Sequence, residues 1–182
     1  MPKPKRYLEK SILVIVMVWI IFTLIIRDQP YIFIDNLNLL FHEAGHWIFL
    51  PFGEFMNVLG GTLMQLIVPT AIAINFAKRK DWLGTLFGTF WLGENWINVS
   101  YYAADAEKQI LPLLGNGTHD WHYLLTQVNI LNQAESIGTA MYWLGACLMF
   151  TSFFSLLYLI IAGFREPTDQ SLMDDSVERV GR

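Results

Sequence analysis

The chain has 182 residues, of which 54% are hydrophobic and 15% aromatic, and its mean hydropathy is +0.38. This composition is typical of a polytopic membrane protein and argues against a soluble globular one. The net charge of −4 offers no basic surface for nucleic acid, so no nucleic-acid partner is expected. Cys147 is the only cysteine, which excludes an intrachain disulfide and a cysteine-rich metal site.

The first predicted element is a transmembrane helix over residues 11–26. Residues 1–10 carry four basic side chains, and the run that follows them is uncharged and apolar. The same pattern fits the start of a signal peptide, but no small-residue cleavage site follows the run. Because Arg27-Asp28-Gln29-Pro30 comes next, we interpret the segment as an uncleaved first span.

The second predicted element is a helix over residues 36–50, about 22 Å long at about 1.5 Å per residue. Asp35 is a suitable N-cap residue, and Pro51 and Gly53 can end the helix. The helix is apolar around a central carboxylate and two imidazoles. Such groups are costly in a segment of this kind unless they have a function.

The centre of this helix reads His-Glu-x-x-His, from His42 to His46. Residues four apart lie on one helix face, so His42 and His46 can bind a single Zn²⁺. Glu43 then lies beside the ion, where it can take a proton from a zinc-bound water. The alternative is a chance match with two satisfied core histidines. Two of the chain's four histidines fall in this motif, which favours the zinc site.

Three further apolar segments are predicted to span the membrane: residues 60–77, 82–103 and 136–163. With the N-terminus in the cytoplasm and four spans in all, ten of the twelve Lys and Arg residues face the cytoplasm. If the motif helix also crossed, this bias would vanish. The motif helix is therefore expected to be re-entrant or embedded from the outer side, packed against protein.

The sequence thus predicts an all-α fold, a polytopic membrane helical bundle of about four transmembrane helices plus the embedded motif helix. Residues 1–164 are expected to form a single membrane-embedded domain, and residues 165–182 an acidic cytoplasmic tail. In an inner or plasma membrane, both termini would be cytoplasmic and the site would lie toward the extracytoplasmic side.

A third zinc ligand is expected from another part of the chain, since catalytic zinc sites typically have three protein ligands. His119 and Asp120 begin a short predicted helix in the outer loop 104–135, and either can supply it. Glu94 and Asp105 are competing candidates. The outer loop is favoured because the motif helix enters from the same side of the membrane.

Polar side chains also recur along one face of the third predicted span, at Glu94, Asn98, Tyr101 and Asp105. An isolated carboxylate in mid-span, as at Glu94, costs about 2.5–3.5 kcal/mol. Glu94 is therefore expected to be protonated, paired or in contact with a wet cavity. Two interpretations stay open, a hydrogen bond between packed helices and a role in the catalytic site.

With these residues the chain resembles the site-2-type intramembrane zinc metalloproteases. The resemblance rests on the motif Phe41-His-Glu-Ala-Gly-His46 within an apolar segment, followed by Gly60-Gly61 at the start of a span. It covers mainly residues 36–70.

The resemblance implies that His42 and His46 hold Zn²⁺ together with a later aspartate, and that Glu43 activates water for peptide hydrolysis in the membrane. The later signature of the family, Asn-x-x-Pro followed by Leu-Asp-Gly, is absent here. In this chain its substitute is His119-Asp120-Trp121. The small size indicates a minimal or divergent member.

Two hypotheses of function follow. The first is a zinc-dependent endopeptidase that acts on a peptide or membrane protein within or near the bilayer, with His122 or Asn98 as a candidate oxyanion donor. The second is a non-catalytic accessory subunit of a larger membrane complex. Seven tryptophans and a Gly84-x-x-x-Gly88 face suit contacts with partner subunits. In one variant, histidine pairs bind a metal or haem.

Overall fold

The computed structural model describes residues 4–27, 31–111 and 119–162, and these residues form helices and turns without a β-strand. The predicted all-α fold is confirmed for them. The predicted tail 165–182 and part of the predicted outer loop, residues 112–118, lie outside the described residues. The helices are α1 (Pro4–Ile21, continued by a π-helical turn, Phe22–Ile26), α2 (Asp35–Phe49), α3 (Glu54–Lys78), α4 (Trp82–Ala104), α5 (Asp120–Gln127) and α6 (Ala134–Ile161), with 3₁₀ turns at Leu50–Phe52 and Leu131–Gln133.

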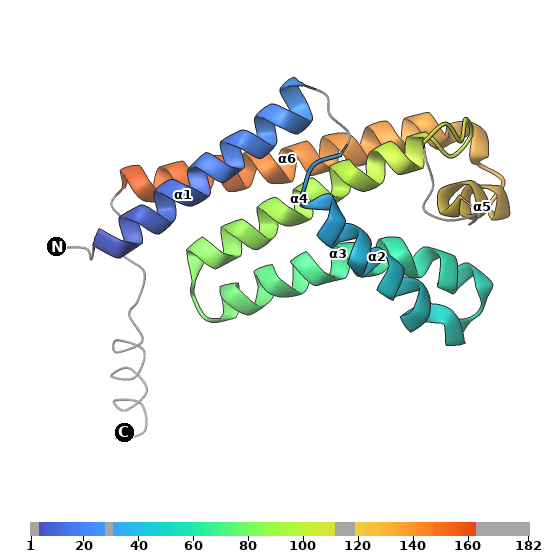
Figure 1. Cartoon of the computed structure of the whole chain (residues 1–182), viewed down its shortest axis with the longest axis horizontal. Coiled ribbons are helices and arrows are strands. Elements are labelled where there is room, and N and C mark those ends of the chain that lie inside the picture. Colours follow the sequence, from blue (N-terminus) through green and yellow to red (C-terminus); the bar gives the residue numbers. More distant parts are fainter. Residues whose placement is uncertain (1–3, 28–30, 112–118, 163–182) are drawn as a thin grey trace, which may run out of the picture.

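Within the described ranges, three helical segments are long and apolar enough to cross a membrane: Leu8–Ile26, Glu54–Lys78 and Leu131–Ile161. They correspond to three of the four predicted spans. Helix α4 has 23 residues, one more than the predicted span 82–103, but it is not one of these segments, because Glu94 and several asparagine, glycine and tyrosine residues lower its hydropathy. It lies between α3 and α6, where polar side chains can face protein instead of lipid (Figure 1).

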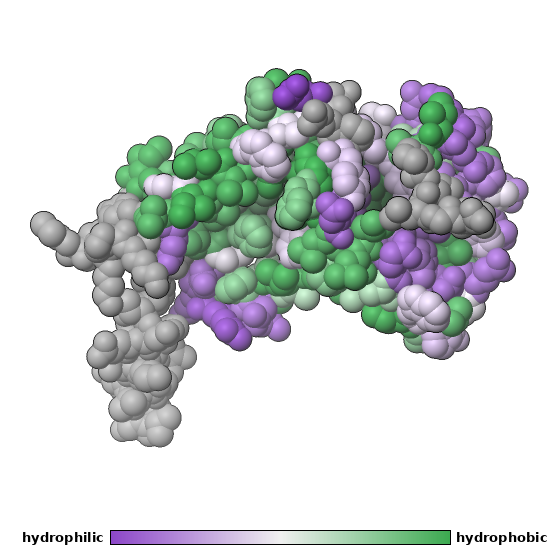
Figure 2. All heavy atoms as spheres, viewed as in Figure 1, coloured by the Kyte–Doolittle hydropathy of each residue, from purple (hydrophilic) through white to green (hydrophobic). Residues whose placement is uncertain are grey.

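The long helices run between two ends of the molecule. The start of α1, the α3–α4 turn and the end of α6 lie at one end, and α5 and the α2–α3 connection lie at the other (Figure 1). Hydrophobic residues cover much of the face between these ends, and hydrophilic residues gather around α5 and at the α3–α4 turn (Figure 2). The turn carries the exposed basic residues Lys78, Arg79 and Lys80.

Glycines allow helices to cross at close range on both sides of the bundle. A Cβ on Gly60 of α3 would lie 2.7 Å from the carbonyl oxygen of Gly45 on α2. A Cβ on Gly93 of α4 would lie 2.7 Å from the carbonyl oxygen of Gly145 on α6. Backbones approach this closely only where both helices present small residues. The crossing at Gly45 brings the His-Glu-x-x-His helix directly against α3.

Helix α2 begins and ends close to the predicted boundaries, but the predicted capping role of Asp35 is wrong. Asp35 is the first helical residue, and its Oδ2 accepts a hydrogen bond from the backbone N–H of Ile32 at 2.6 Å. The carboxylate therefore holds the turn before the helix instead of the free N–H groups of the first helical turn. At the other end, Pro51 lies in the 3₁₀ turn and Gly53 has a φ of 95°, which turns the chain into α3.

Helix α2 buries several polar side chains against the protein and turns large apolar ones outward, together with the polar residues Asn36 and Glu43. Asp35, Asn38 and His42 are buried, whereas Leu40 is exposed and Trp47 is 77% exposed. An amphipathic helix in water has the reverse arrangement. The exposed face of α2 is therefore suited to contact with lipid.

Asn38 connects α2 to α4 through a buried hydrogen-bond network. Its Nδ2 donates to Asp35 Oδ1 at 3.0 Å and to Glu94 Oε2 at 2.9 Å, and its Oδ1 accepts from Trp91 Nε1 at 2.9 Å. Glu94, fully buried, is thus a hydrogen-bonded helix-packing residue, the first of its two interpretations. The network therefore attaches α2 to α4 at Asn38, one helical turn before His42.

Candidate metal centre

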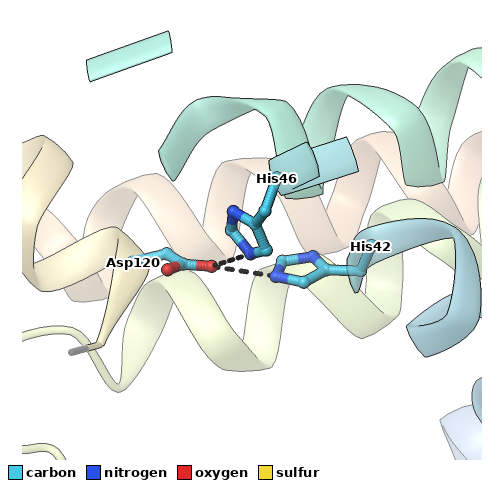
Figure 3. Close-up of side chains that lie close together, drawn as sticks. All are labelled: His42, His46 and Asp120. Carbon is cyan, nitrogen blue, oxygen red and sulfur yellow. Dashed lines mark hydrogen bonds and ion pairs between the residues drawn. The ribbon is translucent and has the colours of Figure 1, made fainter. Parts of the chain in front are cut away.

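Three side chains from two separate parts of the chain converge at the end of the molecule that carries α5. His42 and His46 extend from α2, and Asp120 comes from the first residue of α5 (Figure 3). Asp120 Oδ2 lies 2.8 Å from Nε2 of His42 and 3.3 Å from Nε2 of His46. The three ligand atoms lie within 4.8 Å of one another, close enough to hold a single metal ion.

The Nδ1 atom of each imidazole, which is not the nitrogen that faces Asp120, forms a hydrogen bond. His46 Nδ1 lies 2.8 Å from the backbone carbonyl oxygen of Asn57, which can only accept, so this nitrogen carries the proton. His42 Nδ1 donates to Gln65 Oε1 at 3.3 Å, and Gln65 Nε2 in turn donates to Asn98 Oδ1 at 2.7 Å. Partners of this kind set the tautomer and orientation of metal-binding histidines.

A positive charge at the centre of the cluster would stabilise this arrangement. With Nδ1 protonated, each neutral imidazole turns an Nε2 lone pair toward the carboxylate of Asp120, and these groups repel one another. A proton or a metal cation among them relieves the repulsion. The hydrogen bond with Asp120 accordingly raises the pKa of His46. Burial would raise the pKa of Asp120, but its bonds to both histidines outweigh burial and lower it.

The spacing and the surroundings leave room for a metal ion. Neighbouring ligands of a tetrahedral ion with bonds of about 2.0–2.1 Å lie about 3.3 Å apart, which is the separation of Asp120 Oδ2 from His46 Nε2. The 2.8 Å between Asp120 Oδ2 and His42 Nε2 is a hydrogen-bond distance, so these two side chains would separate slightly around an ion. Gly61 of α3 leaves space beside the ligand nitrogens. A Cβ at this position would lie 2.7 Å from His42 Nε2 and 2.8 Å from His46 Nε2.

We expect Gly61→Ala to weaken the binding of a metal ion such as zinc without removing a ligand, because the added methyl group would lie close to both Nε2 atoms. The loss in affinity should reach the roughly tenfold to hundredfold range seen when residues next to metal ligands are changed. Competition with a chromophoric chelator would measure it.

The matched control is Gly88→Ala at the crossing of α4 and α3. A Cβ there would lie 2.8 Å from the backbone nitrogen of Ala73, so the crowding is similar but distant from the cluster. This variant is expected to retain zinc even if it lowers the melting temperature. Equal zinc affinities for Gly61→Ala and the unaltered protein would contradict the role of Gly61.

Glu43 lies next to the cluster but is not part of it. Its side chain is exposed, and its charge contributes, after other causes, to the raised pKa of His46. A carboxylate in this position is close to the ion site yet free of it. It can therefore accept a proton from a water held there.

Packing against α4 and α6 positions Asp120. Trp121 and Leu125 of α5 are buried with Val99, Ala103 and Ala134 in one apolar cluster. The backbone N–H of Asp120 donates to the hydroxyl oxygen of Tyr102 at 3.0 Å. The short helix also packs against α3, and α4 contacts both α2 and α3, so α5 and the motif helix share these supports.

The other candidate ligands lie outside the cluster. His119 is the N-cap of α5, with Nδ1 accepting from the His122 N–H and Nε2 lying 3.5 Å from Asp105 Oδ2. Burial lowers the pKa of His119. Asp105 also accepts from the N–H groups of the loop that follows α4, and Glu94 belongs to the Asn38 network. Among the described residues, only Asp120 joins the two motif histidines.

Comparison with known proteins gives no match to a family model, to a curated protein or to a solved structure. The function of the chain is therefore inferred from its own residues.

Proposed function

We propose that the chain is a membrane-embedded zinc endopeptidase similar to the site-2-type intramembrane metalloproteases. One observation carries this proposal. Two imidazole nitrogens and one carboxylate oxygen converge beside the glutamate of a His-Glu-x-x-His helix. Three protein ligands with a fourth position open to water are typical of catalytic zinc, whereas structural zinc is closed by four.

Zinc is the metal that suits this set of donors and its surroundings. Ca²⁺ and Mg²⁺ prefer oxygen ligands, which argues against them here. Two histidines and one carboxylate also occur in non-haem iron sites. The glutamate beside the first ligand favours zinc, because water activation needs a nearby base and the His-Glu-x-x-His spacing supplies one.

The chain's own residues would then divide the chemistry of peptide hydrolysis. A bound zinc ion supplies a water of lowered pKa and polarises the scissile carbonyl. Glu43 takes the proton from the attacking water and passes it to the leaving amine. Gln65 and the carbonyl of Asn57 keep both imidazoles directed at the centre, so the site is organised before substrate arrives.

The membrane setting defines the class of substrate. We propose that α4 is a fourth span shielded by α3 and α6, and that α2 is embedded from the outer side with its apolar face in lipid. The positive-inside rule then places both termini in the cytoplasm and the site toward the extracytoplasmic side. A peptide segment within or near the bilayer is the substrate that can reach such a site.

The test is metal removal and restoration on protein purified in detergent. We expect close to one equivalent of zinc per chain. We also expect cleavage of single-span membrane peptides that stops with 1,10-phenanthroline and returns with added zinc. Stoichiometric iron would contradict the zinc assignment. A protein without metal would favour the accessory-subunit hypothesis, and a haem Soret band its haem-binding variant.

A further inference from the structure

Tyr102, in the last turns of α4, lies directly beside the candidate metal centre. Its hydroxyl oxygen accepts the backbone N–H of Asp120 at 3.0 Å. Its ring meets that of His42 edge to face, with centroids 6.2 Å apart, and stacks on that of His119 at 4.2 Å and 31°. The phenol is thus fixed between a proposed ligand from α2 and the residue that starts α5.

The hydroxyl hydrogen of Tyr102 is available to a bound molecule. The bond from Asp120 uses an oxygen lone pair, and the structure describes no hydrogen bond in which this half-buried hydroxyl donates. A tyrosine hydroxyl donates as well as accepts, and a partly buried one usually finds an acceptor. The missing acceptor can be a substrate group at the metal centre.

We propose that Tyr102 is a catalytic residue whose hydroxyl donates a hydrogen bond to the oxyanion formed during peptide hydrolysis. This inference rests on the proposed peptidase function. In the first step the water oxygen bonds to the carbonyl carbon, the π electron pair moves to the carbonyl oxygen, and Glu43 receives the water proton. An electron pair of the negative oxygen then re-forms the carbonyl double bond as the carbon–nitrogen bond breaks, the electron pair of that bond leaves with nitrogen, and nitrogen takes the proton from Glu43. The negative oxygen between these steps is the acceptor for Tyr102.

The two oxyanion donors considered from the sequence are less suitable. His122 Nδ1 lies 2.8 Å from the backbone carbonyl oxygen of Ala106 and 2.9 Å from Gln109 Nε2. The His122 side chain is therefore hydrogen-bonded to the loop after α4. The described hydrogen bond of Asn98 is through its Oδ1, which accepts from Gln65, so Asn98 is connected to His42 through the Gln65 side chain. Tyr102 combines a donor without an acceptor with direct contact to a residue of the cluster.

Tyr102→Phe removes the hydroxyl and keeps the ring. We expect zinc content and KM to be unchanged and kcat to fall about a hundredfold to a thousandfold, the usual result of losing one oxyanion donor. A phosphinic pseudopeptide has a tetrahedral anionic centre, so its affinity should fall by a similar factor. The affinity for a product peptide, which lacks that centre, should stay the same. Calorimetry measures both affinities independently of turnover.

The control is Tyr101→Phe, the same change on the neighbouring residue. The ring of Tyr101 packs against that of Tyr142 on α6, with centroids 6.1 Å apart, so it is directed away from the cluster. This variant should bind the phosphinic peptide as the unaltered protein does.

Three outcomes would overturn the assignment, and each has a different meaning. If Tyr102→Phe loses zinc affinity, Tyr102 positions Asp120 and is not catalytic. If it retains both kcat and the affinity for the phosphinic peptide, the oxyanion contact is wrong while the peptidase function stands. If the unaltered protein neither holds zinc nor hydrolyses peptides, the proposed function fails and the role of Tyr102 fails with it.

Discussion

Glu43→Gln is expected to retain zinc and to lose peptide hydrolysis almost completely. The amide has nearly the shape of the carboxylate but cannot accept a proton from the attacking water. General base catalysis contributes about a hundredfold to ten-thousandfold to rate, and kcat should fall by a factor in this range. Zinc content by elemental analysis and cleavage of a single-span peptide, measured on the same preparation, would separate the two effects.

The control for this prediction is Glu107→Gln. Glu107 is an exposed glutamate in the turn after α4, and it makes no contact with the cluster that the structure describes. Its substitution removes one negative charge from the same end of the molecule. Equal cleavage rates for Glu43→Gln and the unaltered protein would show that Glu43 is not the base, and the accessory-subunit hypothesis would then be favoured.

The helices and the pair of motif histidines could be predicted because their signals are local. Apolar runs mark the membrane segments, and a spacing of four places His42 and His46 on one face. The start of α3 was predicted less well. Hydropathy places it at residue 60, whereas the helix begins at Glu54, since its first turns need not be apolar.

The choice between His119 and Asp120 could not be made from the sequence, because adjacent residues carry equally suitable ligand atoms. It depends on how α5 is rotated about its axis. Burial of Trp121 and Leu125 against α4 and α6 sets this rotation, with His119 as the N-cap. Asp120 is thereby directed at the motif histidines. These contacts depend on packing between distant segments, which no local pattern encodes.

Polar residues in apolar segments could be recognised from the sequence as side chains that need a hydrogen-bond partner, but the partners themselves could not be predicted. Gln65 is one of the few polar residues in its predicted span, and the structure places it on the Nδ1 atom of His42. Glu94 is hydrogen-bonded to Asn38, 56 residues earlier in the chain. The sequence indicates that such side chains need partners, but which partner each finds depends on how the helices cross.

Removal of a ligand is expected to have the largest effect on metal content. His42→Ala and His46→Ala should each abolish stoichiometric zinc, because the site would retain only two of its three protein ligands. Membrane insertion should be unaffected, since α1, α3 and α6 are the segments apolar enough to drive it. His122→Ala is the control, because that histidine is hydrogen-bonded to the loop at Ala106 and lies outside the cluster. Full zinc retention in both motif variants would rule out this metal centre.

The third ligand is tested by comparing Asp120→Ala with His119→Ala. Asp120 Oδ2 is the oxygen that both Nε2 atoms approach, so its loss should weaken zinc binding by more than the roughly hundredfold upper range for residues next to ligands. His119→Ala removes the N-cap of α5, which costs about 0.5–2 kcal/mol of stability, and should reduce zinc affinity less. Chelator competition would rank the two variants. The opposite order would mean that α5 turns His119 toward the ion when zinc binds, and the assignment of Asp120 would be wrong.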